Sequence, residues 1–220
     1  AVTGGWSHSL ALKVDWSSVI FEEDFEGGAN DWGNGSYLAT WFASGGRDDG
    51  AYISVTDDID SSSGGDDGSY SVASCAVAPV SVPYQNCSDG NFTGDWYFTD
   101  GVQELRFWFR HDSAKSGGII PAIRVATPDN SPAGLAVFSA IPSNTWTQLS
   151  VAIYPQNPAW DSSWGASAGV SLPDAVAVFR NVGRLHLGYY TDPYDPAYTE
   201  CNVIFDIDYW QTWCVHLISA

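Results

Sequence analysis

The sequence predicts an all-β protein folded as a two-sheet β-sandwich, with an additional strand ahead of the sandwich. Many short segments alternate apolar and polar residues and are separated by Gly, Pro, Asn and Asp at spacings of about 8 to 12 residues. No segment shows convincing helical periodicity with caps. A chain of 220 residues that is 45% hydrophobic supplies one sizeable core. We therefore expect one sandwich or jelly-roll domain at residues 21–220, preceded by an arm at residues 1–20.

Within the arm, residues 6–16 alternate strictly and contain no turn residue, which is typical of a long half-buried strand. One face of this strand would carry Trp6, His8, Leu10, Leu12, Val14 and Trp16. Such a strand needs a sheet edge, either in its own domain or in a neighbouring copy. Insertion into the next copy would be a head-to-tail contact that can propagate into a filament.

The segment 21–33, FEEDFEGGANDWG, opens the domain with a strand that ends at a Gly-Gly turn. The strand period of two separates core anchors from a row of carboxylates. The anchors are Phe21, Glu23 and Phe25, and the row is Glu22, Asp24 and Glu26.

Further strands follow along the chain by the same alternation. They are expected at 37–43, 50–56, 105–110, 119–126, 135–140, 145–154, 175–179, 184–190 and 203–210. Pro121 argues that its strand is an edge strand or carries a bulge. The acidic stretch 57–69 is expected to be a loop that is either ion-binding or merely solvated.

Charge and cysteine content favour a secreted protein. A net charge of -18, from 8 basic and 26 acidic residues, repels nucleic acid and anionic membranes. No apolar run reaches the roughly 18 residues of a membrane span. The absence of Met, even at position 1, favours a mature form whose signal peptide has been removed.

Four cysteines and three glycosylation sequons, at Asn34, Asn86 and Asn91, fit an extracellular compartment. Cys75 with Cys87 is the easiest pairing to accept, because both lie in a region rich in Gly, Ser and Pro. A local bridge between Cys201 and Cys214 is geometrically awkward, and their pairing stays open.

The polar faces of the central strands gather arginines and aromatic residues on what could be one sheet surface. They are Arg106, Trp108, Arg110, Arg124, Arg184, His186 and Tyr190. Aromatic rings can stack on sugars while arginines bind hydroxyls or acidic groups, and the same patch can dock an acidic subunit. A solvated face without a partner is the plain alternative.

Several motifs together resemble the laminin-B-type and galactose-binding-like jelly-roll modules, which include many carbohydrate-binding modules. The motifs are DFEGGANDWG, GGRDDGAYISVTDD, LRFWFRHDS, NTWTQLSVAI, VGRLHLGYY and FDIDYW, across about residues 21–210. The resemblance implies a two-sheet sandwich with a structural Ca²⁺ between the first and last strands of the module. The matching ligands would be Asp24, Glu26, and Asp206 or Asp208, with Asp48 or Asp49. The 20-residue arm is a departure from these modules.

Two short segments of the sequence match patterns that are typical of catalytic sites. Residues 22–26 match the E-x-D-x-E pattern of jelly-roll glucanases, whose retaining chemistry needs two carboxyl groups about 5 Å apart. Glu22 and Glu26 would lie about 13 Å apart along a strand at Cα level. The G-x-S-x-G pattern at 165–169 lacks the flanking strand and helix of a nucleophile elbow. We therefore expect no enzyme activity.

Our leading hypothesis is a non-catalytic, secreted structural protein that assembles with copies of itself through its N-terminal strand into an extracellular filament or surface layer, supported by calcium and disulfides. The first alternative is a glycan-binding module. The second is a glycosidase that uses Glu22 and Glu26.

Overall fold

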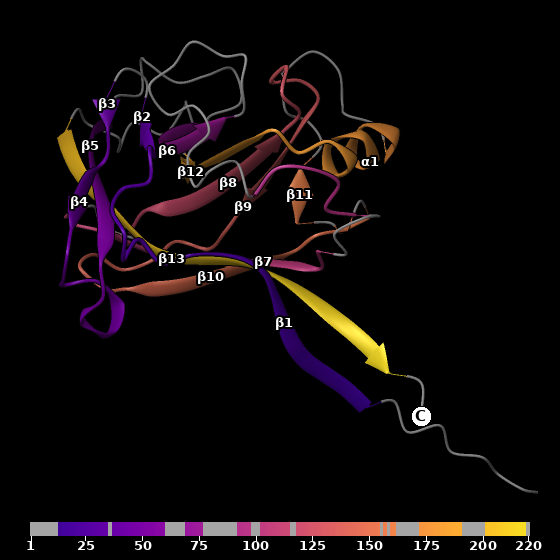
Figure 1. Cartoon of the computed structure of the whole chain (residues 1–220). Helices are drawn as coiled ribbons and strands as arrows, with labels where there is room; N and C mark the ends of the chain where they lie inside the picture. The colour runs from indigo at the N-terminus through magenta and orange to yellow at the C-terminus, as the bar shows by residue number, and fades with distance from the viewer. Residues whose placement is uncertain are drawn as a thin grey trace, which may run out of the picture.

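The structure is a computed structural model that describes residues 13–34, 37–59, 69–76, 92–97, 102–114, 118–154, 156–157, 159–161, 172–190 and 201–218. Two antiparallel sheets pack face to face, so the predicted two-sheet sandwich is confirmed (Figure 1). Within these residues no helix is long and apolar enough to span a bilayer.

The first sheet, called sheet A here, is built around the long strand β13. Its order is β10 (Thr147–Ala152), β7 (Glu104–His111), β13 (Cys201–Ile218), β5 (Tyr52–Ile59) and β4 (Thr40–Phe42), and β1 (Lys13–Glu23) also pairs with β13. Successive residues of β7 alternate between buried and half-buried, so this sheet has one core face and one open face.

The second sheet, sheet B, covers the other side of the core. Its order is β11 (Trp160–Asp161), β9 (Ala133–Val137), β8 (Ile120–Ala126), β12 (Arg184–Tyr190), β6 (Ser69–Ala76), β2 (Gly33–Asn34) and β3 (Tyr37–Leu38). A 3-10 turn, Arg47–Asp49, precedes β5, and one helix, α1 (Leu172–Arg180), precedes β12.

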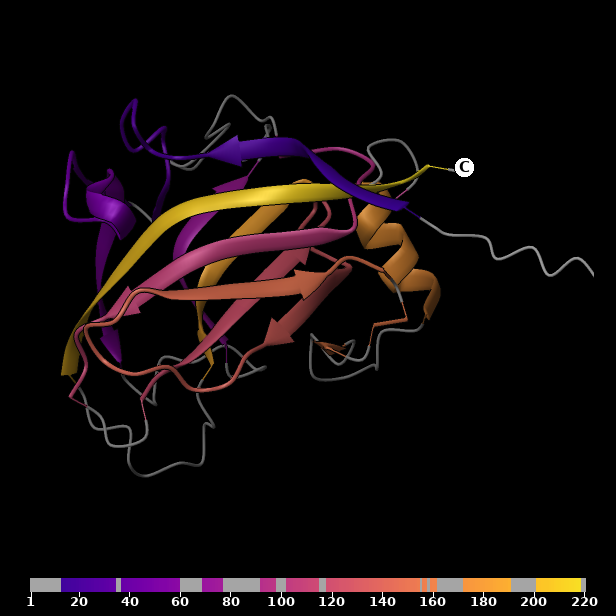
Figure 2. The ribbon, with the colours of Figure 1, turned by 90° about the horizontal axis from the view of Figure 1, so that it is seen from below.

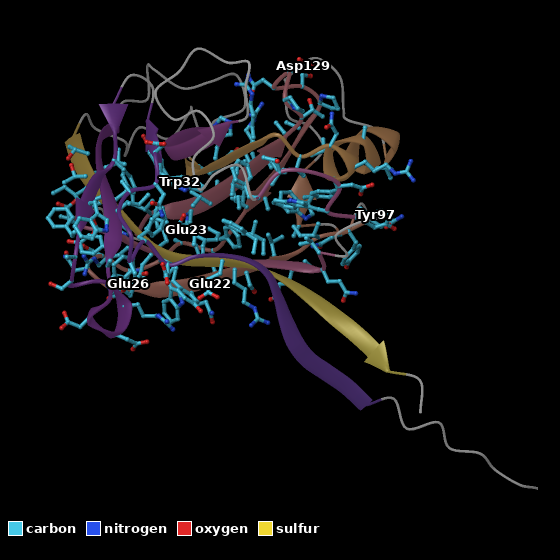
Figure 3. All side chains as sticks on the ribbon, viewed as in Figure 1. Glu22, Glu23, Glu26, Trp32, Tyr97 and Asp129 are labelled. Carbon is cyan, nitrogen blue, oxygen red and sulfur yellow. The ribbon has the colours of Figure 1, made fainter. Side chains whose placement is uncertain are left out.

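Aromatic rings fill the space between the sheets. The ring of Tyr189 from sheet B stacks on that of Phe205 from sheet A, with centroids 4.9 Å apart. Trp32 is fully buried and lies between the sheets in Figure 3. Burial of side chains of this size is the main favourable term that holds the two layers together.

The N-terminal strand pairs with the C-terminal strand of its own chain. The register runs from Lys13 opposite Ile218 to Glu23 opposite Trp210. The far parts of β1 and β13 leave the sandwich together as a two-stranded ribbon (Figures 1 and 2). Because β1 is one strand from Lys13 to Glu23, it crosses the expected boundary between residues 20 and 21.

Some of the residues predicted to form the N-terminal strand lie outside the described part of the chain. Val14 and Trp16 belong to β1, whereas Trp6, His8, Leu10 and Leu12 precede it and are not described.

The strand predicted at 175–179 is wrong, because these residues belong to α1. Val176 and Val178 suit a strand by type, but Pro173 and Asp174 in the first turn are typical of a helix start. Phe179 is buried and packs its ring edge-on against Trp160, with centroids 5.2 Å apart. Tertiary packing of one helix side therefore overrides the β-propensity of the valines.

The opening segment also departs from the predicted single strand. β1 ends at Glu23, and Phe25 has a φ of 57°, so the chain turns there although Phe25 remains buried. Glu22, Asp24 and Glu26 consequently do not form one row along a strand. The predicted strand 37–43 is likewise divided, between β3 in sheet B and β4 in sheet A.

Pro121 does not mark an edge strand or a bulge. β8 lies between β9 and β12, with Pro121 opposite Tyr189 in an unbroken register. Its pairing with β9 begins only at Ala122, and the Pro121 carbonyl accepts the amide of Phe138. Pro121 has no backbone N–H, and it lies one residue outside the paired part of β8 and β9, so the pairing with β9 loses no hydrogen bond.

Three of the four cysteines have a described backbone. Cys75 belongs to β6, and Cys201 and Cys214 both belong to β13. At about 3.3 Å per residue, two positions so far apart on one strand cannot reach the roughly 7 Å between Cα atoms that a disulfide needs. Cys87 is not described, so its predicted bridge to Cys75 stays a prediction.

Candidate functional site

The open face of sheet A, called the outer face here, carries charged and aromatic residues side by side. Arg106, Trp108 and Arg110 alternate with the core residues of β7. In the register of β13, Asp206 lies opposite Arg110 and Asp208 opposite Trp108. The sheet therefore places two carboxylates directly beside an arginine and an indole.

Three rings and one guanidinium form a row across the strands. The Arg110 guanidinium lies 4.3 Å from the ring centroid of Trp146 and 5.2 Å from that of Tyr52. Phe42 stacks on Tyr52 with centroids 4.9 Å apart and planes 9° from parallel. These four residues, from β4, β5, β7 and the residue before β10, are called the aromatic row below. Phe42, 41% exposed, presents a free apolar surface at its end.

Hydrogen bonds fix the guanidinium within the row. Arg110 Nε and Nη2 lie 2.8 and 2.7 Å from Asp206 Oδ2, a carboxylate that is itself buried. Arg110 Nη1 and Trp146 Nε1 both donate to the carbonyl of Gly45. An arginine held by these hydrogen bonds loses little further freedom when a ligand stacks on the row.

A second aromatic cluster adjoins the row. The Arg47 guanidinium lies 5.0 Å from the ring centroid of Trp108 and 4.9 Å from that of Tyr209. Tyr209 has a φ of 43° at a register shift between β13 and β7, so a β-bulge directs its ring over Arg47. Burial, together with a hydrogen bond to Glu22, raises the pKa of Tyr209 to about 12.

Asp208 lies beneath this cluster and is only 3% exposed. Its Oδ2 accepts the backbone amide of Arg47, and burial raises the pKa of its carboxyl to about 6. A Cβ on Gly46 would lie 2.5 Å from the same oxygen, so the turn before β5 packs tightly on Asp208. The turn thus fixes Arg47 above the sheet.

The carboxylates predicted to bind calcium already have partners. Asp24 accepts the amide of Glu26, Glu26 that of Ala51, Asp49 that of Gly45 and Asp208 that of Arg47, while Asp48 pairs with Arg47 and Asp206 with Arg110. Among the residues that the structure describes, no three His, Cys, Asp or Glu side chains are grouped to hold a metal ion. As arranged, these carboxylates serve the turn and the arginines, and the calcium site stays a prediction.

The predicted single surface of arginines and aromatics is wrong, because its members lie on two different sheets. Arg124, Arg184, His186 and Tyr190 belong to β8 and β12 of sheet B. Alternation assigns a residue to one side of its own strand but does not say which sheet the strand joins.

The sheet B residues hold a loop in place. Arg124 donates to the side chain and the carbonyl of Asn130, and Arg184 donates to the carbonyl of Pro128. Burial beside these two arginines lowers the pKa of His186 to about 3. Figure 3 shows Asp129 of this loop far from Glu22 and Glu26, which lie near sheet A.

The two glutamates of the glycosidase alternative have separate partners. Glu26 Oε1 accepts the amide of Ala51, and Glu22 accepts a hydrogen bond from Tyr209. The chain turns at Phe25 between them, so they do not share a strand as the glucanase pattern requires.

The predicted glycosylation sites stay predictions. Asn34 lies in β2, whereas Asn86, Asn91 and the segment 165–169 fall outside the described residues.

Sequence reasoning missed most of the aromatic row. In the strand predicted at 50–56, alternation puts Tyr52 on the face opposite the apolar Ala51 and Ile53, which is a usable signal. Phe42 lies directly opposite Tyr52 in the register. Trp146 falls in the strand predicted at 145–154, on the face opposite the buried Leu149 and Val151, so alternation gives a usable signal there too. Arg47 lies in the 3-10 turn, where alternation is silent. Tyr209 needs a bulge that no local sequence rule predicts.

Comparisons with known proteins found no matching family model and no matching curated protein. Solved structures that are similar include the L4b domain of human laminin alpha-2, with 12% identity and a TM-score of 0.40, covering 81% of this chain and 98% of that chain.

Family 11 carbohydrate-binding modules of Clostridium thermocellum are also similar. One, from the cellulosomal cellulase Lic26A-Cel5E, has 14% identity and a TM-score of 0.41, covering 90% of this chain and 97% of that chain. Another, in complex with a β-1,3-1,4-mixed-linked tetrasaccharide, has 14% identity and a TM-score of 0.40, covering 90% and 98%. Both kinds of module named from the sequence are therefore among the similar structures.

Proposed function

We propose that the protein is a non-catalytic glycan-binding module whose ligand stacks on the aromatic row of sheet A. The observation that carries this proposal is the Arg110 guanidinium, which Asp206 fixes against the rings of both Tyr52 and Trp146, while these two rings contact each other edge to face with centroids 5.7 Å apart. Aromatic rings can stack on the apolar face of a sugar ring, and charged groups beside them can form hydrogen bonds with the sugar hydroxyls. We also propose that the protein is secreted.

The chemistry of the row favours a neutral glycan over a polyanion. Asp206 neutralises Arg110, and the whole chain carries a net charge of -18. A strongly anionic polymer would be repelled at long range, whereas stacking and neutral hydrogen bonds are little affected by this field.

The test is isothermal titration calorimetry against a panel of soluble polysaccharides. We expect Trp146→Ala to weaken binding at least about tenfold, the scale of losing one stacking anchor. The matched control is Tyr154→Ala, which removes an exposed aromatic ring after the far end of β10. Equal loss in both variants, or no binding by the parent protein to any polysaccharide, would refute the proposal.

Filament formation through a donated N-terminal strand stays a prediction that concerns residues 1–12. From Lys13 onward β1 is already paired within its own chain. Electron microscopy of the full chain and of a variant lacking residues 1–12 tests it, since filaments must vanish in the truncated form.

A further inference from the structure

Beyond the sandwich, β13 pairs with a described strand on one edge only. Its last pair with β7 joins Trp213 to Glu104, whereas its pairing with β1 continues to Ile218. From Cys214 to Ile218, no other described strand lies along its second edge. Two-stranded ribbons are marginal in water, and at least three strands are needed for independent stability. Among the strands that the structure describes, none is therefore the third strand of this part of the ribbon.

The two edges of the ribbon are not equally suited to a new strand. Two register shifts place extra residues in β1, between Asp15 and Ser18 and between Val19 and Phe21. Bulges of this kind twist an edge and obstruct further pairing. The extra residues fall on β1 and not on β13, so the β13 edge is the one that can accept a strand.

Charge identifies what can approach this edge. The chain has a net charge of -18, so two copies repel one another over most of their surfaces. Residues 209–218, YWQTWCVHLI, contain no Asp, Glu, Lys or Arg. They are also rich in β-branched and aromatic residues, which favour strand pairing. A second copy therefore meets no edge charge here, and salt screens the repulsion from the more distant charges.

We propose that the Cys214–Ile218 edge of β13 pairs antiparallel with the same edge of a second copy. The product is a two-fold dimer with a four-stranded sheet in the order β1–β13–β13–β1. Such an edge is complementary to itself, so the contact closes at two copies and does not propagate. Full overlap places the two-fold axis beside His216, with Cys214 opposite the partner's Ile218. This inference does not depend on glycan binding.

The test is the mass of the full chain by analytical ultracentrifugation, under reducing conditions so that no disulfide links the copies. We expect twice the chain mass of 23.7 kDa. His216→Lys places two like charges at the axis and should raise the dimer dissociation constant at least tenfold. The matched control, Ser17→Lys, adds the same charge to a bulge of β1 and should leave the dimer intact.

A monomer at all concentrations overturns the proposal, and so does equal weakening by the two lysines. Larger assemblies that disappear when residues 1–12 are removed overturn it in favour of strand donation.

Hydrogen exchange on the parent protein covers the case in which His216→Lys fails to fold. Amides of 214–218 should become protected as concentration rises, while those of β10, an edge strand of sheet A, should not change. Protection that is independent of concentration at 214–218 contradicts the dimer.

Discussion

At the scale of single residues, β7 carries two arginine pairs with different surroundings. Side-chain exposure is 23% for Arg110 and 10% for its partner Asp206, but 28% for Arg106 and 26% for Glu104. We expect Asp206→Asn to lower the free energy of unfolding by about 1–3 kcal/mol, because Arg110 loses its counter-charge. Glu104→Gln should cost less than about 1 kcal/mol. Urea unfolding measures both, and a larger cost for Glu104→Gln would contradict the burial argument.

Asp208 makes stability depend on pH. Its carboxyl has a pKa of about 6 in the folded protein against an ordinary value of 3.8. The folded state therefore holds a proton that the unfolded state releases, and this stabilisation is complete below pH 4 and lost as the pH rises through 6. At about 1.4 kcal/mol per pKa unit, the loss is up to about 3 kcal/mol.

Asp208→Asn should therefore unfold at higher denaturant than the parent at pH 7.5, and the advantage should shrink at pH 4.5. The comparison is made with a chelator present, so that metal binding does not contribute. A difference between the two proteins that is the same at both pH values would show that Asp208 does not titrate in this range.

At the scale of elements, the turn from Gly45 to Gly50 decides where Arg47 lies. A Cβ at Gly46 would lie 2.5 Å from Asp208 Oδ2 and 2.7 Å from the carbonyl of Gly50, whereas one at Gly27 would lie 4.0 Å from its nearest atom. Gly46→Ala should destabilise the protein by about 1–3 kcal/mol through overpacking, with little effect from Gly27→Ala. Thermal unfolding tests this, and a silent Gly46→Ala would show that the turn can shift.

How well an element could be predicted depended on whether local rules decide it. β7 and β12 were found almost to the residue, because strict alternation matches burial on one side. α1 was missed because Val and Phe suit strands, and packing against β11 decides the matter instead. The bulge at Tyr209 depends on a partner strand distant in sequence.

At the scale of the whole molecule, the two layers followed from the sequence but the order of strands did not. Arg110 and Arg124 have the same pattern around them, yet they lie on opposite sides of the sandwich because their strands join different sheets. Sheet membership is set by long-range pairing and core packing, which local periodicity does not record. The outer face therefore became visible only in the structure.

The two sheets also oppose one another in their response to acid. His186 in sheet B has a pKa of about 3, so the unfolded state takes up a proton below about pH 6.5 that the folded state refuses. The contribution of His186 to the free energy of unfolding therefore falls as the pH drops from 6.5 toward 3. The contribution of Asp208 changes in the opposite direction. We expect His186→Asn to resist acid unfolding better than the parent, measured by circular dichroism from pH 7 to 3. A variant that unfolds at the same pH as the parent would contradict the shift.

β13 is a single strand of 18 residues that runs from the sandwich into the ribbon. Tension applied at its C-terminal end is carried along the strand and loads its hydrogen bonds to β1, β5 and β7 in shear, all at once. A ladder sheared lengthwise must break many bonds together, whereas one peeled from its end breaks them singly. A pull along the axis of β13 is therefore expected to meet more resistance than a pull that peels the strand from one end.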